Sequence, residues 1–401
     1  MAMLLKLEEP AAAPPAGWAL WALGFRPFYL LAALLAALSV PLWALQATGL
    51  LGHAYLNGPA WHAHEMLFGF ALAVIVGFLF TAGRNWSNQP TPTGVALAAI
   101  AALWLAARLL VLSPWPLAAA AANVAFPLAA AWGLGRALFA ARNRRNYFFV
   151  GLLVAMAAAA AVFHAVQLGA LALPGPLGLT LGLDIVLVIM AVMGGRVIPM
   201  FTNNGVPGAG AQVRRGVERA AMAGVIALAA FDALAGLLGT AWPALAAALA
   251  LAAAAAQGLR WALWRPWRTL RVPLVWVLHL AYAWIPLHLL LRALAAAGIV
   301  APSAATHALT VGAIGGLTIA MMTRTARGHT ARPLRADRAD VAAYALVAAA
   351  ALVRVGLPLA WPAAQVHAVL CSALLWSAGF AIYVWHYAPW LARPRLDGRP
   401  G

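Results

Sequence analysis

Cysteine is almost absent from this chain, which has Cys371 as its single cysteine among 401 residues. One cysteine cannot form an internal disulfide, a C-x-x-C-H attachment site for haem, or an iron–sulfur or dinuclear copper centre built by this chain alone. A metal bound here must therefore depend mainly on histidine, and the chain has 10 histidines.

Charged residues are scarce as well. They make up 9% of the sequence, against 65% hydrophobic residues, and a water-soluble domain with this balance would expose large apolar patches. Acidic residues are rarer than basic ones, with 9 Asp and Glu against 26 Lys and Arg and a net charge of +17. In a soluble protein this charge would favour nucleic acid as a partner, but the basic residues here stand in short clusters between long apolar runs. The composition predicts a lipid bilayer as the partner, and no nucleic acid.

The apolar runs are each long enough to cross a bilayer as a helix. They predict an all-α, polytopic integral membrane bundle of about twelve transmembrane helices, in a single domain over 18–390. A cytoplasmic tail is expected at 1–17, which has no apolar core before Trp18 and so does not read as a cleaved signal peptide, and a basic cytoplasmic tail at 391–401. The predicted helices lie near 22–46, 60–82, 93–112, 117–141, 146–172, 177–201, 217–239, 241–263, 273–298, 303–326, 339–359 and 361–388.

Arginines between the apolar runs follow an alternating pattern. Odd-numbered connections, such as ATGLLGHAYLNGP and LPGPLG, contain no Lys or Arg. Because basic loops stay on the cytoplasmic side of a membrane, this alternation predicts that both termini face the cytoplasm. The even-numbered connections carry Arg84; Arg142, Arg144 and Arg145; Arg214, Arg215 and Arg219; Arg265, Arg268 and Arg271; Arg327, Arg332, Arg335 and Arg338; and Arg393 and Arg395.

Histidines at membrane depth are the most informative polar residues, since each costs free energy unless it is paired, ligated or hydrated. A single histidine in an apolar helix is more often a packing residue than a ligand, but a group at one depth favours ligands. His288 falls near mid-bilayer, and His279, His329 and His386 lie toward the cytoplasmic side. The group expected toward the outer ends of helices consists of His62, His64, His164, His307 and His367.

The segment NGPAWHAHEMLFGF opens the second helix with two of these histidines. Helical spacing would put His62 and Glu65 on one face and His64 nearly opposite, so that the two histidines serve two adjacent centres. The order H-x-H-E differs from the H-E-x-x-H pattern of zinc proteases, which excludes that class.

The segment THALTVGAIGG opens the tenth helix in a similar way. A glycine follows five residues and an arginine twenty residues after His64 and again after His307. Two histidines offered from two helices at equal depth are what a six-coordinate haem b requires, so His64 and His307 are the predicted axial ligands. The glycines after each histidine would leave room for a flat macrocycle or, alternatively, serve ordinary helix packing; they are Gly69, Gly312, Gly315 and Gly316.

Other charged residues at membrane depth allow two interpretations each. Asp184 and Asp232 are candidates for a proton path or for ion pairs, and Glu65 or Asp184 could relay protons in catalysis. Arginines near outer helix ends offer counter-charges: Arg108, Arg292 and Arg354. Arginines at inner helix ends either reach the headgroups or pair with haem propionates or an anionic substrate; they are Arg26, Arg84, Arg196 and Arg324.

Five motifs together, GFRPFYLL, WHAHEMLFGFALAVIVGFLFTAGRNW, GGRVIPMFTNN, LHLAYAWIPL and HALTVGAIGGLTIAMMTRTARGHTARPL, resemble the NnrS family of bacterial inner-membrane proteins. The family is described as containing haem and copper and as acting in nitric oxide metabolism and protection from nitrosative stress. The resemblance implies a multi-pass protein of the bacterial inner membrane. It implies functional roles for His62, His64, His279, His307 and His329 and for Arg26, Arg84, Arg196 and Arg324, with His164 as a weaker match.

A further analogy is to the twelve-helix subunit of haem–copper oxidases and nitric oxide reductases, in which helices two and ten carry histidines for a haem. Here the sixth and seventh helices lack the histidines that bind copper in those proteins. Copper would therefore use other residues, for instance His62, His164 or His367.

Three functions remain open from the sequence. The first is a haem-binding and copper-binding redox protein that binds or reduces nitric oxide, or relieves iron-nitrosyl stress, with electrons from a quinol or a redox protein. The second is a proton-coupled twelve-helix secondary transporter, and the third is a membrane sensor or assembly factor that binds haem without turnover. Histidine favours the first, because imidazole is the natural ligand of iron and copper, whereas a transporter gains little from it.

Overall fold

The computed structural model describes residues 17–47, 52, 55–56 and 58–399. Within that part of the chain the regular elements are helices, and twelve helical stretches are long and apolar enough to cross a membrane. The predicted all-α polytopic bundle is confirmed, and the predicted ends of the spans differ from the observed ones by a few residues. Of the predicted tail 1–17, only Gly17 lies inside the described residues.

The first six spans are formed by α1 (Phe25–Ala47); by α2 (Gly58–His64), the π-helix η1 (Glu65–Ala71) and α3 (Leu72–Ser87) in one continuous span; by α4 (Gly94–Val111); by α5 (Pro116–Ala140); by the short η2 (Arg144–Asn146) with α6 (Tyr147–Gln167); and by α7 (Leu177–Gly205). The last six are formed by α8 (Arg215–Leu238); by α9 (Pro243–Leu263) with η3 (Pro266–Arg268); by α10 (Pro273–Ala296); by α11 (Pro302–His307), the π-helix η4 (Ala308–Gly315) and α12 (Gly316–His329); by α13 (Arg338–Ala351), the π-helix η5 (Leu352–Gly356) and α14 (Leu357–Ala360); and by η6 (Pro362–Ala364) with α15 (Gln365–Ala392).

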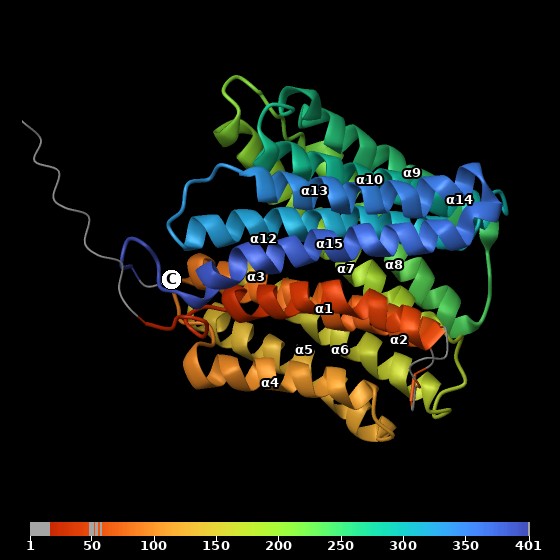
Figure 1. Ribbon diagram of the computed structural model, residues 1–401. Helices are drawn as coiled ribbons and strands as arrows, with labels where there is room; N and C mark the ends of the chain where they lie inside the picture. The colour runs from red at the N-terminus through yellow and green to blue at the C-terminus, as the bar shows by residue number, and fades with distance from the viewer. Residues whose placement is uncertain (1–16, 48–51, 53–54, 57, 400–401) are drawn as a thin grey trace, which may run out of the picture.

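The spans lie side by side as a bundle of long helices (Figure 1). Several begin with proline in the first turn, where its missing N–H leaves no backbone bond unmade, as in α5, α9, α10 and α11. The second span, Gly58–Ser87, is the most enclosed, with 89% of its most apolar window buried, whereas α8 has 17%. The histidine-bearing second span therefore runs through the centre of the bundle, and α8 lies at its lipid-facing edge.

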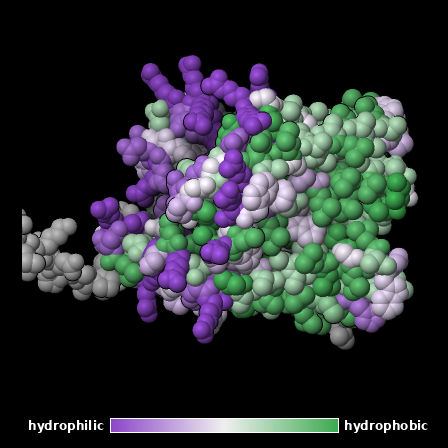
Figure 2. Space-filling view, turned by 90° about the horizontal axis from the view of Figure 1, so that it is seen from above, coloured by the Kyte–Doolittle hydropathy of each residue, from purple (hydrophilic) through white to green (hydrophobic). Residues whose placement is uncertain are grey.

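Both ends of the described chain lie at one end of the bundle, where the backbone N–H of Ala19 donates to the carbonyl of Ala392 over 2.8 Å. Hydrophilic side chains gather at this end, and a mostly hydrophobic surface covers the rest of the visible face (Figure 2). The arginine-bearing connections follow even-numbered spans and so lie here too. The protein is a multi-pass membrane protein, and the assignment of this end to the cytoplasm stays a prediction of the positive-inside rule.

Candidate cofactor site

A cavity of about 440 Å³ lies among α2–η1, α7, α11–η4, η5 and α15. Its walls are mostly apolar and aromatic, with Trp43, Phe70 and Trp376 among them. Three of the lining side chains bear chemistry for a ligand: His62, His307 and Arg354.

The two cavity histidines are held in different ways. The ring of His62 lies 5.0 Å from that of Trp43, centroid to centroid, and its Nδ1 is buried with no hydrogen-bond partner in the part of the chain that the structure describes. His307 Nδ1 lies 2.7 Å from the carbonyl of Ser303 and donates to it, which leaves Nε2 as the free acceptor. Metal-bound histidines use this arrangement, with the second ring nitrogen donating to a carbonyl or carboxylate.

Each of the three polar lining residues stands beside or inside a π-helix. In the described part of the chain, η1 begins three residues after His62, η4 begins directly after His307, and η5 contains Arg354. A π-helix is rare and occurs mostly as a short insertion at functional sites. The similarity that the sequence shows between the second and tenth helices therefore extends to their backbone geometry.

A second histidine pair lies buried between α2 and α6. The Nε2 atoms of His64 and His164 are 3.1 Å apart. His64 Nδ1 lies 2.8 Å from Glu65 Oε1, and Tyr55 Oη lies 2.9 Å from His164 Nδ1. Arg108 completes the group as the counter-charge of Glu65, with Arg108 Nε 3.3 Å from Glu65 Oε2.

Arg108 is the counter-charge of Glu65, as the sequence anticipated for the outer arginines. It is itself buried and also donates to Asn123 Oδ1. Gly69 makes this approach possible, because a Cβ at that position would overlap the Arg108 guanidinium. The carboxylate of Glu65 is thus fixed between an imidazole and a guanidinium.

The pairing of the histidines differs from the expectation in two respects. His62 and Glu65 do not contact the same group. The Glu65 carboxylate bonds to the ring of His64, the residue before it, at the start of η1. The structure also brings His62, rather than His64, to the cavity with His307. The chain still offers two adjacent groups, as predicted, but with His64 joined to His164.

The glycines that follow His64 and His307 serve helix packing. A Cβ at Gly312 would overlap the ring of Trp284, one at Gly315 would overlap Trp376, and one at Gly316 would lie 2.6 Å from Ala281 Cβ. The expectation that these glycines form a shallow surface for a macrocycle is wrong, since neighbouring side chains fill that space.

The remaining predicted histidines lie outside the cavity lining. His279 Nε2 is 2.7 Å from Thr202 Oγ1, and the His329 ring lies 5.5 Å from that of Phe25. Neither lines the cavity in the described part of the chain. Both are held by contacts within the protein near the basic end of the bundle.

The four motif arginines also belong to the basic half. Arg26 Nη1 donates to the carbonyls of Leu391 and Arg393 at the end of α15, and Arg84 stands in the last turn of α3. Arg196 donates to Asn146 Oδ1 over 2.7 Å, and the Arg324 guanidinium lies 3.8 Å above the Phe201 ring. These contacts favour the interpretation in which the arginines fix helix ends at the interface.

Sequence reasoning missed two charged clusters. The first joins Arg260 of α9 to Glu218 of α8, with Nε and Oε1 2.9 Å apart, and Arg260 also donates to Tyr282 Oη and the carbonyl of Ala191. Arg260 is only 2% exposed. A sequence offers no periodic signal for such a pair, because its partners come from separate helices.

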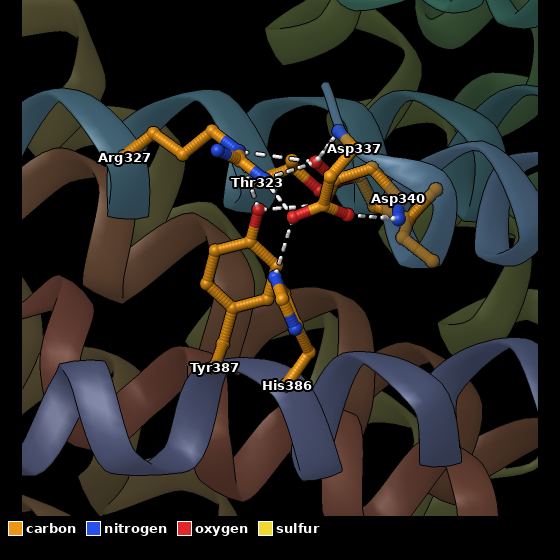
Figure 3. A network of polar contacts seen from close by, with 7 residues as sticks. Thr323, Arg327, Asp337, Asp340, His386 and Tyr387 are labelled. Atoms are coloured by element: carbon orange, nitrogen blue, oxygen red, sulfur yellow. Dashed lines mark hydrogen bonds and ion pairs between the residues drawn. The ribbon is translucent and has the colours of Figure 1, made fainter. Parts of the chain in front are cut away.

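The second missed cluster joins α12, α13 and α15 (Figure 3). Asp337, Asp340 and His386 bring ligand atoms within 4.8 Å of one another, as a metal site would. Arg327 already supplies the positive charge, with Nη2 2.6 Å from Asp337 Oδ2 and 2.5 Å from Asp340 Oδ2, and Tyr387 donates to Asp340 Oδ1 over 2.7 Å. The arrangement is an ion-pair clasp between helices. Its one sequence signal is the D-x-x-D capping box that starts α13.

Acid should loosen this clasp. Burial alone would raise the pKa of Asp337, but the backbone N–H of Asp340 and the Arg327 guanidinium outweigh it and hold the pKa below its usual value. A lowered pKa contributes stability that is present above the unfolded-state pKa of about 3.9 and is lost as pH falls through the folded-state value. We expect the thermal midpoint in detergent to fall below about pH 4, and Asp337→Asn to make that fall shallower. An equally steep fall in the variant would contradict this role.

These features define a class: a polytopic helical membrane protein whose core holds a cavity lined by two histidines, beside a second buried histidine pair. The family model described as NnrS protein matches residues 19–395. The chain therefore belongs to the NnrS family, and this membership links it to nitric-oxide-related function. A search of curated proteins gives no match.

Proposed function

We propose that this protein binds haem b in the 440 Å³ cavity and acts on nitric oxide there. The observation that carries the proposal is that one apolar cavity receives His62 from the second span and His307 from the tenth. Opposed imidazoles from two helices are the ligand set of a six-coordinate haem. This assignment uses His62 in place of His64, the partner of His307 expected from sequence.

The residues present fit that group. The cavity volume lies within the range of about 300 to 1,000 Å³ typical of cofactor sites, and its aromatic walls suit a macrocycle. Among the described residues His62 Nδ1 has no hydrogen-bond partner and is buried, and His307 is oriented by the carbonyl of Ser303. Arg354 provides a cation for a propionate. Haem iron, when bound, would supply redox chemistry and would take nitric oxide in exchange for one of the two imidazoles, and the apolar cavity walls disfavour water around it.

Copper fits the His64–His164 pair. Neutral imidazole nitrogen is a suitable ligand for copper, and each ring is oriented through its Nδ1, by Glu65 for His64 and by Tyr55 for His164. A carboxylate behind a ligating histidine fixes its tautomer. In this scheme Glu65 is a positioning residue for His64, and the proton-relay role expected for it from sequence passes to other carboxylates.

The test is a visible absorption spectrum of the detergent-purified protein, oxidised and reduced, with metal analysis of the same sample. The proposal expects a Soret band that sharpens on reduction and shifts on addition of nitric oxide, together with iron and copper in the sample. A colourless protein without iron, from cells supplied with haem precursor, would overturn it. That outcome would favour a proton-coupled transporter, for which the intramembrane contacts of Arg292 with Asp184 and Asp232 are the supporting observation.

The positive-inside rule gives the orientation. With the basic end in the cytoplasm of a bacterial inner membrane, the histidine cavity lies in the outer half of the bilayer. Electrons would come from a quinol or a redox protein, since this chain has one cysteine and no covalent haem motif.

A further inference from the structure

Three charged side chains meet within the membrane where α7, α8 and α10 pack together. Arg292 Nη1 lies 3.3 Å from Asp184 Oδ1, and Arg292 Nη2 forms an ion pair with Asp232 Oδ2. The Asp184 side chain is 6% exposed, that of Asp232 10% and that of Arg292 23%. One guanidinium therefore serves two largely buried carboxylates.

The charges of this cluster do not balance. With every group ionised it carries one net negative charge in a medium of low dielectric constant, which strongly disfavours an unpaired ion. A single proton on either carboxylate would neutralise it. Asp184 Oδ2 is buried and has no hydrogen-bond partner among the described residues, so the cluster contains an oxygen available to hold that proton.

The other buried acid–arginine clusters in the described part of the chain leave no excess negative charge within the membrane. Glu65 and Arg108 are one acid and one base. Glu218 and Arg260 form a pair of one acid and one base. Asp337 and Asp340 share Arg327, but Asp337 lies outside the membrane-spanning segments and its side chain is 42% exposed, so that water can solvate it. The Asp184–Asp232 cluster differs because its described ion pairs involve Arg292 alone.

The titratable and charged groups that face the cluster come from the three helices that form it. Asp184 belongs to α7, Asp232 to α8, and Arg292 and His288 to α10, with His288 one turn before Arg292. His288 Nδ1 is 2.8 Å from the carbonyl of Ala305, and its Nε2 is buried with no hydrogen-bond partner within 17–47, 52, 55–56 and 58–399. His288 is thus the second group in this region with an unsatisfied polar atom.

The cluster adjoins the cavity wall. Leu183, the residue before Asp184, and Thr180, one turn earlier, both line the cavity from α7. On the other side, Ala305, which accepts from His288, stands two residues before His307 on α11. The cluster and the cavity are therefore linked through α7 and through the hydrogen bond between His288 and Ala305.

We propose that Asp184 and Asp232 together bind one exchangeable proton on Arg292, forming a buried proton-binding site beside the cavity. The site goes beyond the proposed function, because its proton is required by the charge balance of this chain whether or not haem is present. If chemistry in the cavity consumes protons, this site is a buried store for them beside the cavity wall.

The experiment is infrared spectroscopy of the complete purified protein in lipid, in water and in deuterium oxide. The wild-type protein is expected to show the carbonyl stretch of a protonated buried carboxylic acid, which shifts on deuteration. Asp184→Asn and Asp232→Asn should each abolish that signal, since either change leaves one carboxylate with one arginine and no need of a proton. Glu218→Gln, which alters a balanced pair, should leave it unchanged.

The outcomes separate this proposal from the haem assignment. A wild-type protein without the signal, or a signal that survives in both Asn variants, would overturn the proton site whatever the haem content. If one variant fails to fold, the other decides, because the charge argument predicts the same loss for both. If the purified wild-type protein contains no haem but shows the carboxylic acid signal, the result would support the proton site and contradict the proposed function.

Discussion

Replacing His307 with alanine is expected to leave a folded protein that purifies almost without haem, and His62→Ala should do the same. Each change removes one of the two imidazoles that line the cavity. The protein would bind haem much more weakly when either of the two histidine ligands is missing. The measurement is the ratio of haem to protein after purification. His367→Ala is the matched control, because His367 is exposed and does not line the cavity in the described structure.

The same series distinguishes the two histidine groups. His64→Ala and His164→Ala should keep haem and lose copper, because these residues face each other outside the cavity. Full haem in both His62→Ala and His307→Ala would refute the cavity assignment. Loss of haem in His64→Ala with retention in His62→Ala would restore the axial pair expected from sequence.

Gly195→Ala should prevent stable folding. A Cβ at Gly195 would overlap the Arg260 guanidinium, with Arg260 Cζ 2.7 Å away, and the guanidinium cannot retreat without leaving Glu218 and Tyr282. Breaking a buried ion pair in this way costs about 3 to 5 kcal/mol. The yield of monodisperse protein and its thermal midpoint in detergent measure the effect.

Gly151→Ala supplies the comparison for that change. Gly151 lies within α6, and a Cβ there would meet nothing within 4 Å. Alanine has the higher helix propensity, so this variant should be as stable as the wild type or slightly more so. Equal yields and midpoints for the two variants would show that Arg260 moves freely, and would contradict its role as a fixed member of the cluster.

The spans could be predicted from sequence because the bilayer imposes one rule on every residue within it. Apolar length sets each helix, and arginine placement marks alternate connections. The same reasoning gave Arg292 as one of three arginines available as counter-charges for intramembrane carboxylates, and Arg292 forms an ion pair with Asp184. Such predictions succeed because an intramembrane carboxylate must find a cation somewhere, and few are available.

The pairing of histidines could not be predicted in the same way. Sequence spacing assumes a regular α-helix, and it assigned His62 and Glu65 to one face, whereas Glu65 reaches His64 at the start of η1. The approach of His64 to His164 depends on how α2 and α6 lie against each other, and a single sequence does not encode that distance. The Arg260 cluster escaped notice for the same reason, since its partners come from α7, α8, α9 and α10.

The π-helix η1 marks the place where the second span can lose a residue. A π-helix holds more residues in each turn than an α-helix, so that deleting one residue within Glu65–Ala71 would let the segment relax to regular α geometry. Because the wider turn already takes up the extra residue, the parts of the span on either side would keep nearly their present rotation. A one-residue deletion in the regular helix α3 would instead turn His62 and His64 by about 100° relative to the residues that follow it. One-residue gaps in this span among functional relatives should therefore fall within η1.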